Sequence, residues 1–165
     1  MRALVLAVVV GAVFAAGASA SLPQRLNKTQ WAAYTKVNTA FTTQTPKSVA
    51  RFRYCLSKTT GSRNARAMQQ CFGNTADLEL TATKNLFAQV QKFTGKTTGA
   101  CNQSLSSYQS QLFFWQSTIT GVSRAVHSNV ANTATITGQA SAAQQVYPKL
   151  TKAAASFAAA CKPKS

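Results

Sequence analysis

The strongest constraint on the fold is a hydrophobic repeat that runs from Cys101 to Cys161. In its first half, apolar residues recur at steps of three and four, at Leu105, Tyr108, Leu112, Trp115, Ile119, Val122, Val126 and Val130. The second half continues at Ile136, Ala140, Ala143, Tyr147, Leu150, Ala154, Phe157 and Cys161. This spacing is typical of amphipathic helices that bury one face. Because the stretch 129–134 between the halves is polar, the repeat predicts a long helical hairpin.

Residues 1–20 have the layout of a cleaved secretory signal peptide. Arg2 precedes an apolar run over residues 3–14, and small residues follow up to Ala20. The run is shorter than the roughly twenty residues that a membrane helix needs, and it ends in an Ala-x-Ala cleavage pattern. We expect cleavage after Ala20 and a secreted protein, extracellular or periplasmic. Residues 21–165 would then form a single helical-bundle domain with no transmembrane span.

The four cysteines fit two helical hairpins. Antiparallel helices pair residue for residue around their turn, and the midpoint of Cys101 and Cys161 is position 131, inside the polar stretch. The midpoint of Cys55 and Cys71 is position 63, inside a second polar segment over 61–64. An even number of cysteines in an exported chain is typical of disulfides. We therefore predict the disulfides Cys55–Cys71 and Cys101–Cys161.

Apolar faces and helix-breaking residues divide the upstream part into shorter helices, over 23–43, 46–60, 65–72 and 75–93. Proline at position 46 suits the first turn of a helix, and glycine at position 73 suits the end of one. Together with the C-terminal hairpin, these elements predict an all-α, disulfide-stapled bundle of five to six helices. Pro148 is expected to kink the last helix or to split it.

The chain has eighteen Lys and Arg but only two acidic residues, Asp77 and Glu79, and its formal net charge is +16. Removal of Arg2 with the signal peptide leaves seventeen basic and two acidic residues, a charge of +15. The two carboxylates lie two residues apart on one predicted helix, so they diverge and do not form the pair that glycoside hydrolysis uses. After Asn74, a good N-cap, they suit the first turn of that helix. Glu79 also lies on the apolar stripe, where an arginine is a plausible ion-pair partner.

Few other residues suit catalysis or metal binding. His127 is the only histidine, no triad signature accompanies it, and the cysteines are assigned to disulfides. Ligands for zinc, iron or calcium are too few, and no glycine-rich nucleotide loop is present. We therefore expect a protein that is not an enzyme, with no catalytic residues, no metal and no cofactor.

The basic residues concentrate between Arg25 and Arg66, where no acidic residue interrupts them. On the helix that begins at position 46, one stripe contains three cations, and Tyr54 falls within it. An aromatic ring among exposed cations suits a polyanion such as nucleic acid, whereas a basic surface can also serve solubility alone. The candidate polyanion-binding residues are Lys47, Arg51, Tyr54, Lys58, Arg63 and Arg66.

Aromatic residues on the helix after Cys101 suggest a different function. Trp115 lies on the apolar seam, whereas Phe113 and Phe114 project to the other side of the helix. Either the N-terminal helices pack behind this helix, or an apolar ligand such as a lipid is held between helices. The candidate apolar-ligand residues are Tyr108, Phe113, Phe114 and Trp115.

These patterns favour a secreted binding protein whose basic N-terminal half engages an anionic polymer or surface, either nucleic acid or an envelope polyanion. The first alternative is a carrier of a lipid or other apolar ligand. The second is a protein–protein interaction module, an inhibitor or a toxin-like factor, with an acidic partner.

Overall fold

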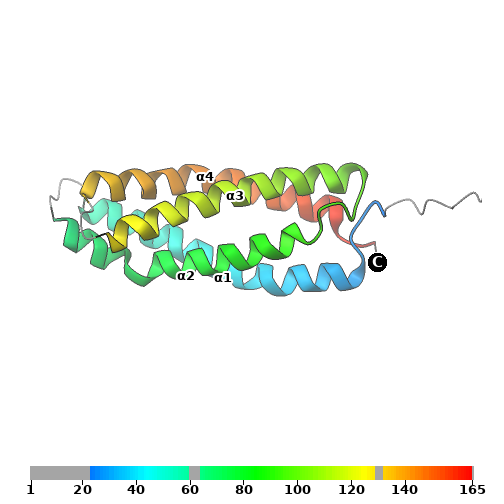
Figure 1. Ribbon diagram of the computed structural model, residues 1–165, viewed down its shortest axis with the longest axis horizontal. Helices are drawn as coiled ribbons and strands as arrows, with labels where there is room; N and C mark the ends of the chain where they lie inside the picture. The colour runs from blue at the N-terminus through cyan, green and yellow to red at the C-terminus, as the bar shows by residue number, and fades with distance from the viewer. Residues whose placement is uncertain (1–22, 60–63, 129–131, 165) are drawn as a thin grey trace, which may run out of the picture.

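The computed structural model describes residues 23–59, 64–128 and 132–164. These residues form four helices and no strand: α1 (Lys28–Thr59), α2 (Ala65–Gln91), α3 (Gly99–His127) and α4 (Thr133–Cys161). Successive helices run in opposite directions along one long axis, and α1 also contacts α4, so the fold is an elongated up-and-down four-helix bundle (Figure 1). The expected signal peptide, residues 1–20, lies outside the described residues.

The all-α class and the C-terminal hairpin are confirmed, but the expected five to six helices are four. α1 continues through Pro46, where two separate helices had been predicted. A proline inside a helix removes one backbone hydrogen bond. However, residues on both sides of Pro46 share one buried face, at Phe41, Thr45, Val49 and Phe52. Packing of this face against the core outweighs the local break. α4 likewise continues through Pro148 as one helix.

α2 also merges two predicted helices, because it bends at Gly73 without ending there. Gly73 has φ 36° and ψ −137°, outside the helical region, while Phe72 and Ala76 around it are fully buried. Asn74 directly follows this bend. The N-cap of α2 is Asn64, whose side-chain oxygen accepts a hydrogen bond from Ala67 N at 3.0 Å.

The apolar seams of α3 and α4 meet in the core, as the repeat predicted. Their buried members include Leu105, Leu112, Ile119, Val122, Ile136, Ala140 and Leu150. Three rings form the centre of the core at one end of the bundle. Tyr108 stacks on Phe157 with ring centroids 5.2 Å apart, and Tyr34 of α1 meets both rings edge-on. Contacts between these rings join α1 to the α3–α4 hairpin.

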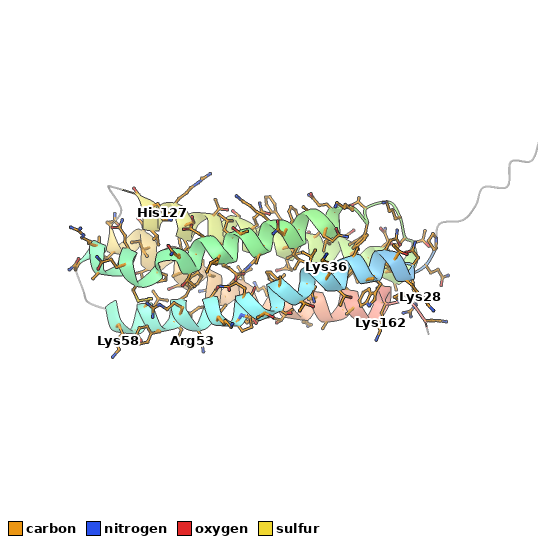
Figure 2. The ribbon with its side chains drawn as sticks, turned by 90° about the horizontal axis from the view of Figure 1, so that it is seen from below. Lys28, Lys36, Arg53, Lys58, His127 and Lys162 are labelled. Carbon is orange, nitrogen blue, oxygen red and sulfur yellow. A yellow bond between two sulfur atoms is a disulfide. The ribbon has the colours of Figure 1, made fainter. Side chains whose placement is uncertain are left out.

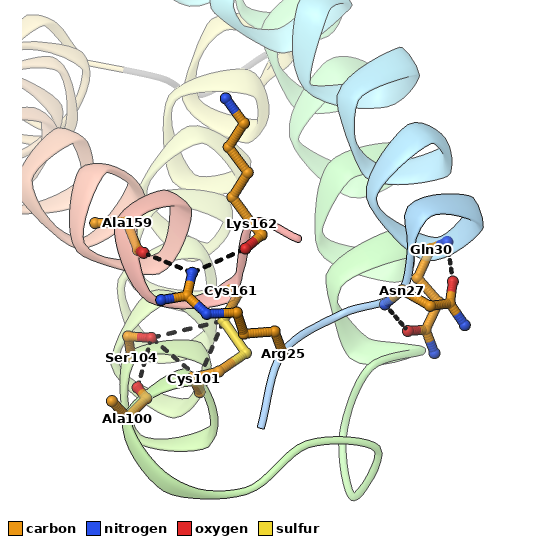
Figure 3. The surroundings of a disulfide bond; sticks show 9 residues. All are labelled: Arg25, Asn27, Gln30, Ala100, Cys101, Ser104, Ala159, Cys161 and Lys162. Carbon is orange, nitrogen blue, oxygen red and sulfur yellow. Dashed lines mark hydrogen bonds between the residues drawn. A yellow bond between two sulfur atoms is a disulfide. The ribbon is translucent and has the colours of Figure 1, made fainter. Parts of the chain in front are cut away.

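Both predicted disulfides are present. Cys55–Cys71 joins α1 to α2 near their turn, and Cys101–Cys161 joins the beginning of α3 to the end of α4. Beside the second disulfide, Arg25 donates to the carbonyl oxygens of Ala159 and Lys162, at 3.3 and 2.9 Å (Figure 3). Within the described residues, no helix is long and apolar enough to cross a membrane.

Candidate functional site

The two carboxylates lie in different environments, and each is engaged within the bundle. Glu79 is fully buried, and its Oε1 accepts hydrogen bonds from Thr45 Oγ1 and Trp115 Nε1, both at 2.8 Å, and from Thr83 Oγ1 at 3.3 Å. Among the described residues, no arginine pairs with Glu79, so neutral donors from three helices replace the expected ion pair. Burial raises the pKa of Glu79, and the hydrogen bonds oppose only part of this effect.

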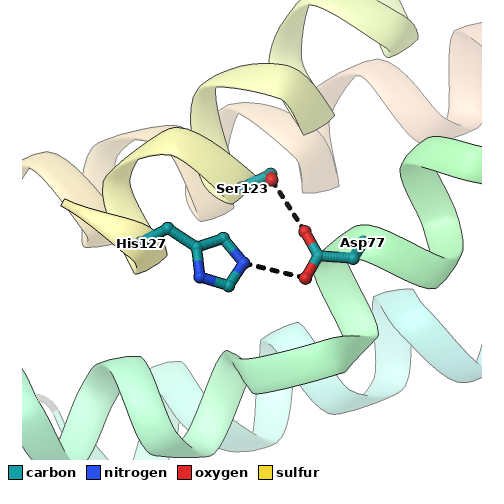
Figure 4. Close-up of polar contacts among 3 residues, drawn as sticks. All are labelled: Asp77, Ser123 and His127. Carbon is teal, nitrogen blue, oxygen red and sulfur yellow. Dashed lines mark hydrogen bonds and ion pairs between the residues drawn. The ribbon is translucent and has the colours of Figure 1, made fainter.

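Asp77 is partly exposed and joins α2 to the end of α3 (Figure 4). Its Oδ1 accepts a hydrogen bond from Ser123 Oγ, and its Oδ2 lies 2.8 Å from His127 Nε2. Partial burial raises the pKa of the Asp77 carboxyl, but the contacts with His127 and Ser123 favour the ionised form more strongly. The pKa of Asp77 therefore lies below its ordinary value.

The residues of this cluster are those of a hydrolytic triad, but their order differs. In a triad, the imidazole lies between the serine and the carboxylate and removes the serine proton. Here the Asp77 carboxylate lies between the other two side chains, and Ser123 donates its proton to that carboxylate instead of to His127. This geometry joins α2 to α3, and it leaves the His127 imidazole bonded to Asp77 and not to Ser123. In the described part of the chain, no group of three or more His, Cys, Asp or Glu side chains is placed to hold a metal.

Both carboxylates are engaged by neutral donors or by His127, so neither is paired with a lysine or an arginine of the described residues. Of the eighteen Lys and Arg residues, Arg2 and Arg63 lie outside the described residues, which leaves sixteen. None of these sixteen forms an ion pair with Asp77 or Glu79. The positive charge of the bundle is therefore uncompensated by its own acidic side chains.

The basic stripe of α1 forms around Tyr54, which is 49% exposed. The Arg51 guanidinium lies 5.4 Å from the centre of the Tyr54 ring, and the Lys58 ammonium lies 6.0 Å from it. Arg51 also donates its Nε–H to the carbonyl oxygen of Cys71 at 2.9 Å, which ties the stripe to α2. The Tyr54 ring thus contacts two cations of the protein itself and helps to hold them in place.

Of the other polyanion candidates, Lys47 belongs to the stripe predicted on this helix, whereas Arg63 and Arg66 come after the end of α1 in the chain. Lys47 is exposed on α1, and Arg66 is exposed in the first turn of α2. Arg63 lies outside the described residues. Figure 2 shows that Lys36 and Arg53, which the sequence did not single out, also project from α1. Both side chains are exposed, whereas the nearby Tyr34 and Phe52 are buried in the core.

The four apolar-ligand candidates do not gather at one place. Tyr108 and Trp115 are fully buried and pack against other rings; Tyr147 of α4, for example, lies 5.8 Å from Trp115. Phe113 and Phe114 are 56% and 54% exposed, so the N-terminal helices do not cover them. Phe113 has one aromatic neighbour on α2, Phe87, at 6.5 Å.

Comparisons with known proteins identify no relative: no family model, curated protein or solved structure matches the chain.

Proposed function

We propose that this protein binds anionic polymers or anionic surface material through the exposed basic residues of α1, its basic face. The observation that carries the proposal is the composition of this helix. It has no acidic residue, and its six basic residues are Lys28, Lys36, Lys47, Arg51, Arg53 and Lys58. Since no carboxylate of the bundle pairs with these cations, their charge is available to an external polyanion.

The geometry favours binding that depends on charge more than on sequence. Arg51 is held by Cys71 and Tyr54, so it loses little conformational entropy when an anion binds. The lysines on either side are long and exposed, which suits contacts with phosphate, sulfate or carboxylate groups of a repeating polymer. Two disulfides fit an oxidising compartment, so we place this binding outside the cytoplasm.

The test is a salt titration of binding to a labelled DNA duplex and to heparin, followed by fluorescence anisotropy. We expect the logarithm of the affinity to fall linearly with the logarithm of salt concentration. The triple variant K47Q/R53Q/K58Q should show a slope smaller by roughly 0.9 for each phosphate contact removed. The matched control K84Q/K92Q/K96Q removes the same charge from α2 and the turn after it.

The outcome separates a binding face from general attraction. A larger loss of affinity in the α1 variant than in the control supports the proposal. Equal losses would mean that net charge alone attracts the polymer. No binding of either polymer at low salt, together with binding to an acidic protein, would favour the interaction-module alternative.

The exposed pair Phe113 and Phe114 favours a second candidate function, contact with an apolar ligand on the outside of α3. This differs from a carrier with an internal cavity, because Tyr108 and Trp115 are occupied by core contacts. Reduced binding of a fluorescent apolar probe by F113S/F114S would support it, and unchanged binding would count against it.

A further inference from the structure

A groove at one end of the bundle has a composition that the basic face of α1 does not explain. It lies between the beginning of α1 and the chain that follows α4, and its volume is about 720 Å³. Its lining residues are Lys28, Trp31, Ala32, Lys162, Pro163 and Lys164. This volume is within the roughly 300–1,000 Å³ that is usual for small-molecule sites.

The aromatic wall of the groove is fixed by the core. Trp31 is partly buried, and its ring lies 5.1 Å from that of Tyr34 and 6.2 Å from that of Phe157. Since these contacts hold one part of the indole, the remainder faces the groove together with Ala32 and Pro163. The groove therefore has an apolar wall that does not depend on a ligand for its position.

The opposite wall is held by three separate bonds. The Cys101–Cys161 disulfide fixes the last residue of α4, and Leu26 N donates to the carbonyl oxygen of Cys161 at 3.1 Å. Arg25 donates to the carbonyl oxygen of Lys162, one residue further along (Figure 3). The short segment with Lys162 and Pro163 is thus held beside α1, and a preformed wall lowers the entropic cost of binding.

The positive charge of the groove favours an anionic ligand. Three of its six lining residues are lysines, and no acidic residue lines it. Figure 2 shows Lys28 and Lys162 at the same end of the bundle. A ligand with a negative head and an apolar tail would satisfy both the lysines and the Trp31 wall.

A second groove provides a comparison within the same molecule. It lies between α1 and α2 and has a volume of about 430 Å³. It is lined by Lys36, Lys92, the polar side chains of Asn85 and Gln89, and small apolar side chains. It has two lysines but no aromatic ring. The combination of a fixed indole with three ammonium groups therefore distinguishes the groove around Trp31 from this one.

We propose that the groove around Trp31 binds a small anionic amphiphile, the carboxylate of a medium-chain fatty acid. The carboxylate would lie among Lys28, Lys162 and Lys164, and the acyl chain along Trp31 and Pro163. This site shares Lys28 with the basic residues of α1, but it lies apart from the part of that surface around Tyr54. About 30 residues of α1 separate Lys28 from Lys58, a distance of roughly 45 Å along a helix.

Brominated dodecanoate, used below its micelle concentration, is a probe that quenches tryptophan fluorescence on contact. The oxidised protein has two tryptophans, of which Trp115 is fully buried. We expect saturable quenching in the wild type and its loss in W31F, whose remaining fluorescence comes from Trp115. Quenching that persists unchanged in W31F would overturn the proposed position of the ligand.

Calorimetric titration with dodecanoate tests the head group. We expect K28Q/K162Q to weaken binding at least tenfold, and the uncharged analogue dodecanol to bind at least tenfold more weakly. The control K149Q/K152Q removes two lysines from a groove between α3 and α4 and should change affinity less than twofold. Equal weakening by both lysine pairs, or equal affinity for dodecanol, would overturn the proposal. Polymer binding by α1 is measured separately, so either result can fail without the other.

Discussion

Trp115 donates its indole N–H to Glu79 Oε1 at 2.8 Å, and both side chains are fully buried. Because Thr45 of α1 donates to the same oxygen, one carboxyl group connects three helices. The other oxygen, Oε2, is buried without a hydrogen-bond partner on the protein. A buried polar contact of this kind specifies one alignment of the helices. Apolar packing alone defines that alignment less strictly.

Replacement of Glu79 by Gln should change the pH dependence of stability. Burial raises the pKa of Glu79 above its ordinary value of 4.5, so the folded protein binds this proton more tightly than the unfolded chain does. Stability then falls as the pH rises above 4.5, until the folded pKa is passed. We expect the free energy of unfolding of the wild type to fall relative to that of E79Q over this interval. Urea unfolding at several pH values measures it, and a difference that is constant with pH would contradict it.

Replacement of Trp115 by Phe should remove one donor from the buried carboxyl group. We expect a loss of about 2 kcal/mol in the free energy of unfolding, since hydrogen bonds to charged groups contribute roughly 1.5–3 kcal/mol. The control is W31F, at a partly exposed position. In the background of E79L, which has no acceptor at this position, W115F should cost less; an equal cost in both backgrounds would mean that packing alone accounts for the effect.

Two glycines, one in α2 and one in α4, should respond to alanine in opposite directions. Gly73 has φ +36°, and a Cβ atom there would meet nothing within 4 Å, so the expected loss of about 1–3 kcal/mol comes from the backbone alone. Gly138 lies inside α4, also with open space around a Cβ atom and no positive φ. G138A should therefore stabilise the protein by about 0.5–1 kcal/mol. Thermal unfolding of both variants checks the pair, and a stabilised G73A would contradict the bend at Gly73.

Removal of either disulfide should have a similar effect, although the loops differ in length. The cysteines are 16 and 60 residues apart, and the entropy of loop closure gives about 3 and about 4 kcal/mol respectively. We expect C55S/C71S and C101S/C161S to differ by roughly 1 kcal/mol in urea unfolding. A several-fold difference would show that one pair acts through the folded structure instead of the unfolded chain.

The sequence was sufficient to predict features that depend on regular spacing. The steps of three and four fixed which faces of α3 and α4 are buried, and the midpoint of Cys101 and Cys161 fixed their pairing. The helix end predicted at Pro46 was wrong, because buried side chains on both sides continue one face and their packing outweighs the local cost. At Gly73 the predicted break corresponds to a bend with non-helical φ and ψ, although α2 continues beyond it.

The polar contacts depend on information that spacing does not contain. Asp77 meets His127 and Ser123, which are 50 and 46 residues away on another helix. Predicting that contact requires the alignment of α2 against α3. Glu79 did show one signal, its position on the apolar stripe, which correctly indicated burial. The identity of its donors, Thr45 and Trp115, depends on the three-dimensional arrangement of α1 and α3.

The positions of the two disulfides determine how the chain responds to a protease. A cut between Thr59 and Asn64 falls inside the Cys55–Cys71 loop, and a cut between Ser128 and Asn132 falls inside the Cys101–Cys161 loop. Each would leave one covalent molecule with its four helices attached. The connection from Lys92 to Thr98 is the helix connection that neither loop encloses. Its residues Phe93 and Thr97 are buried, and Thr98 N donates to the carbonyl oxygen of Pro23 at 3.1 Å. The one connection whose cleavage would divide the bundle into two halves is thus the one anchored by buried side chains.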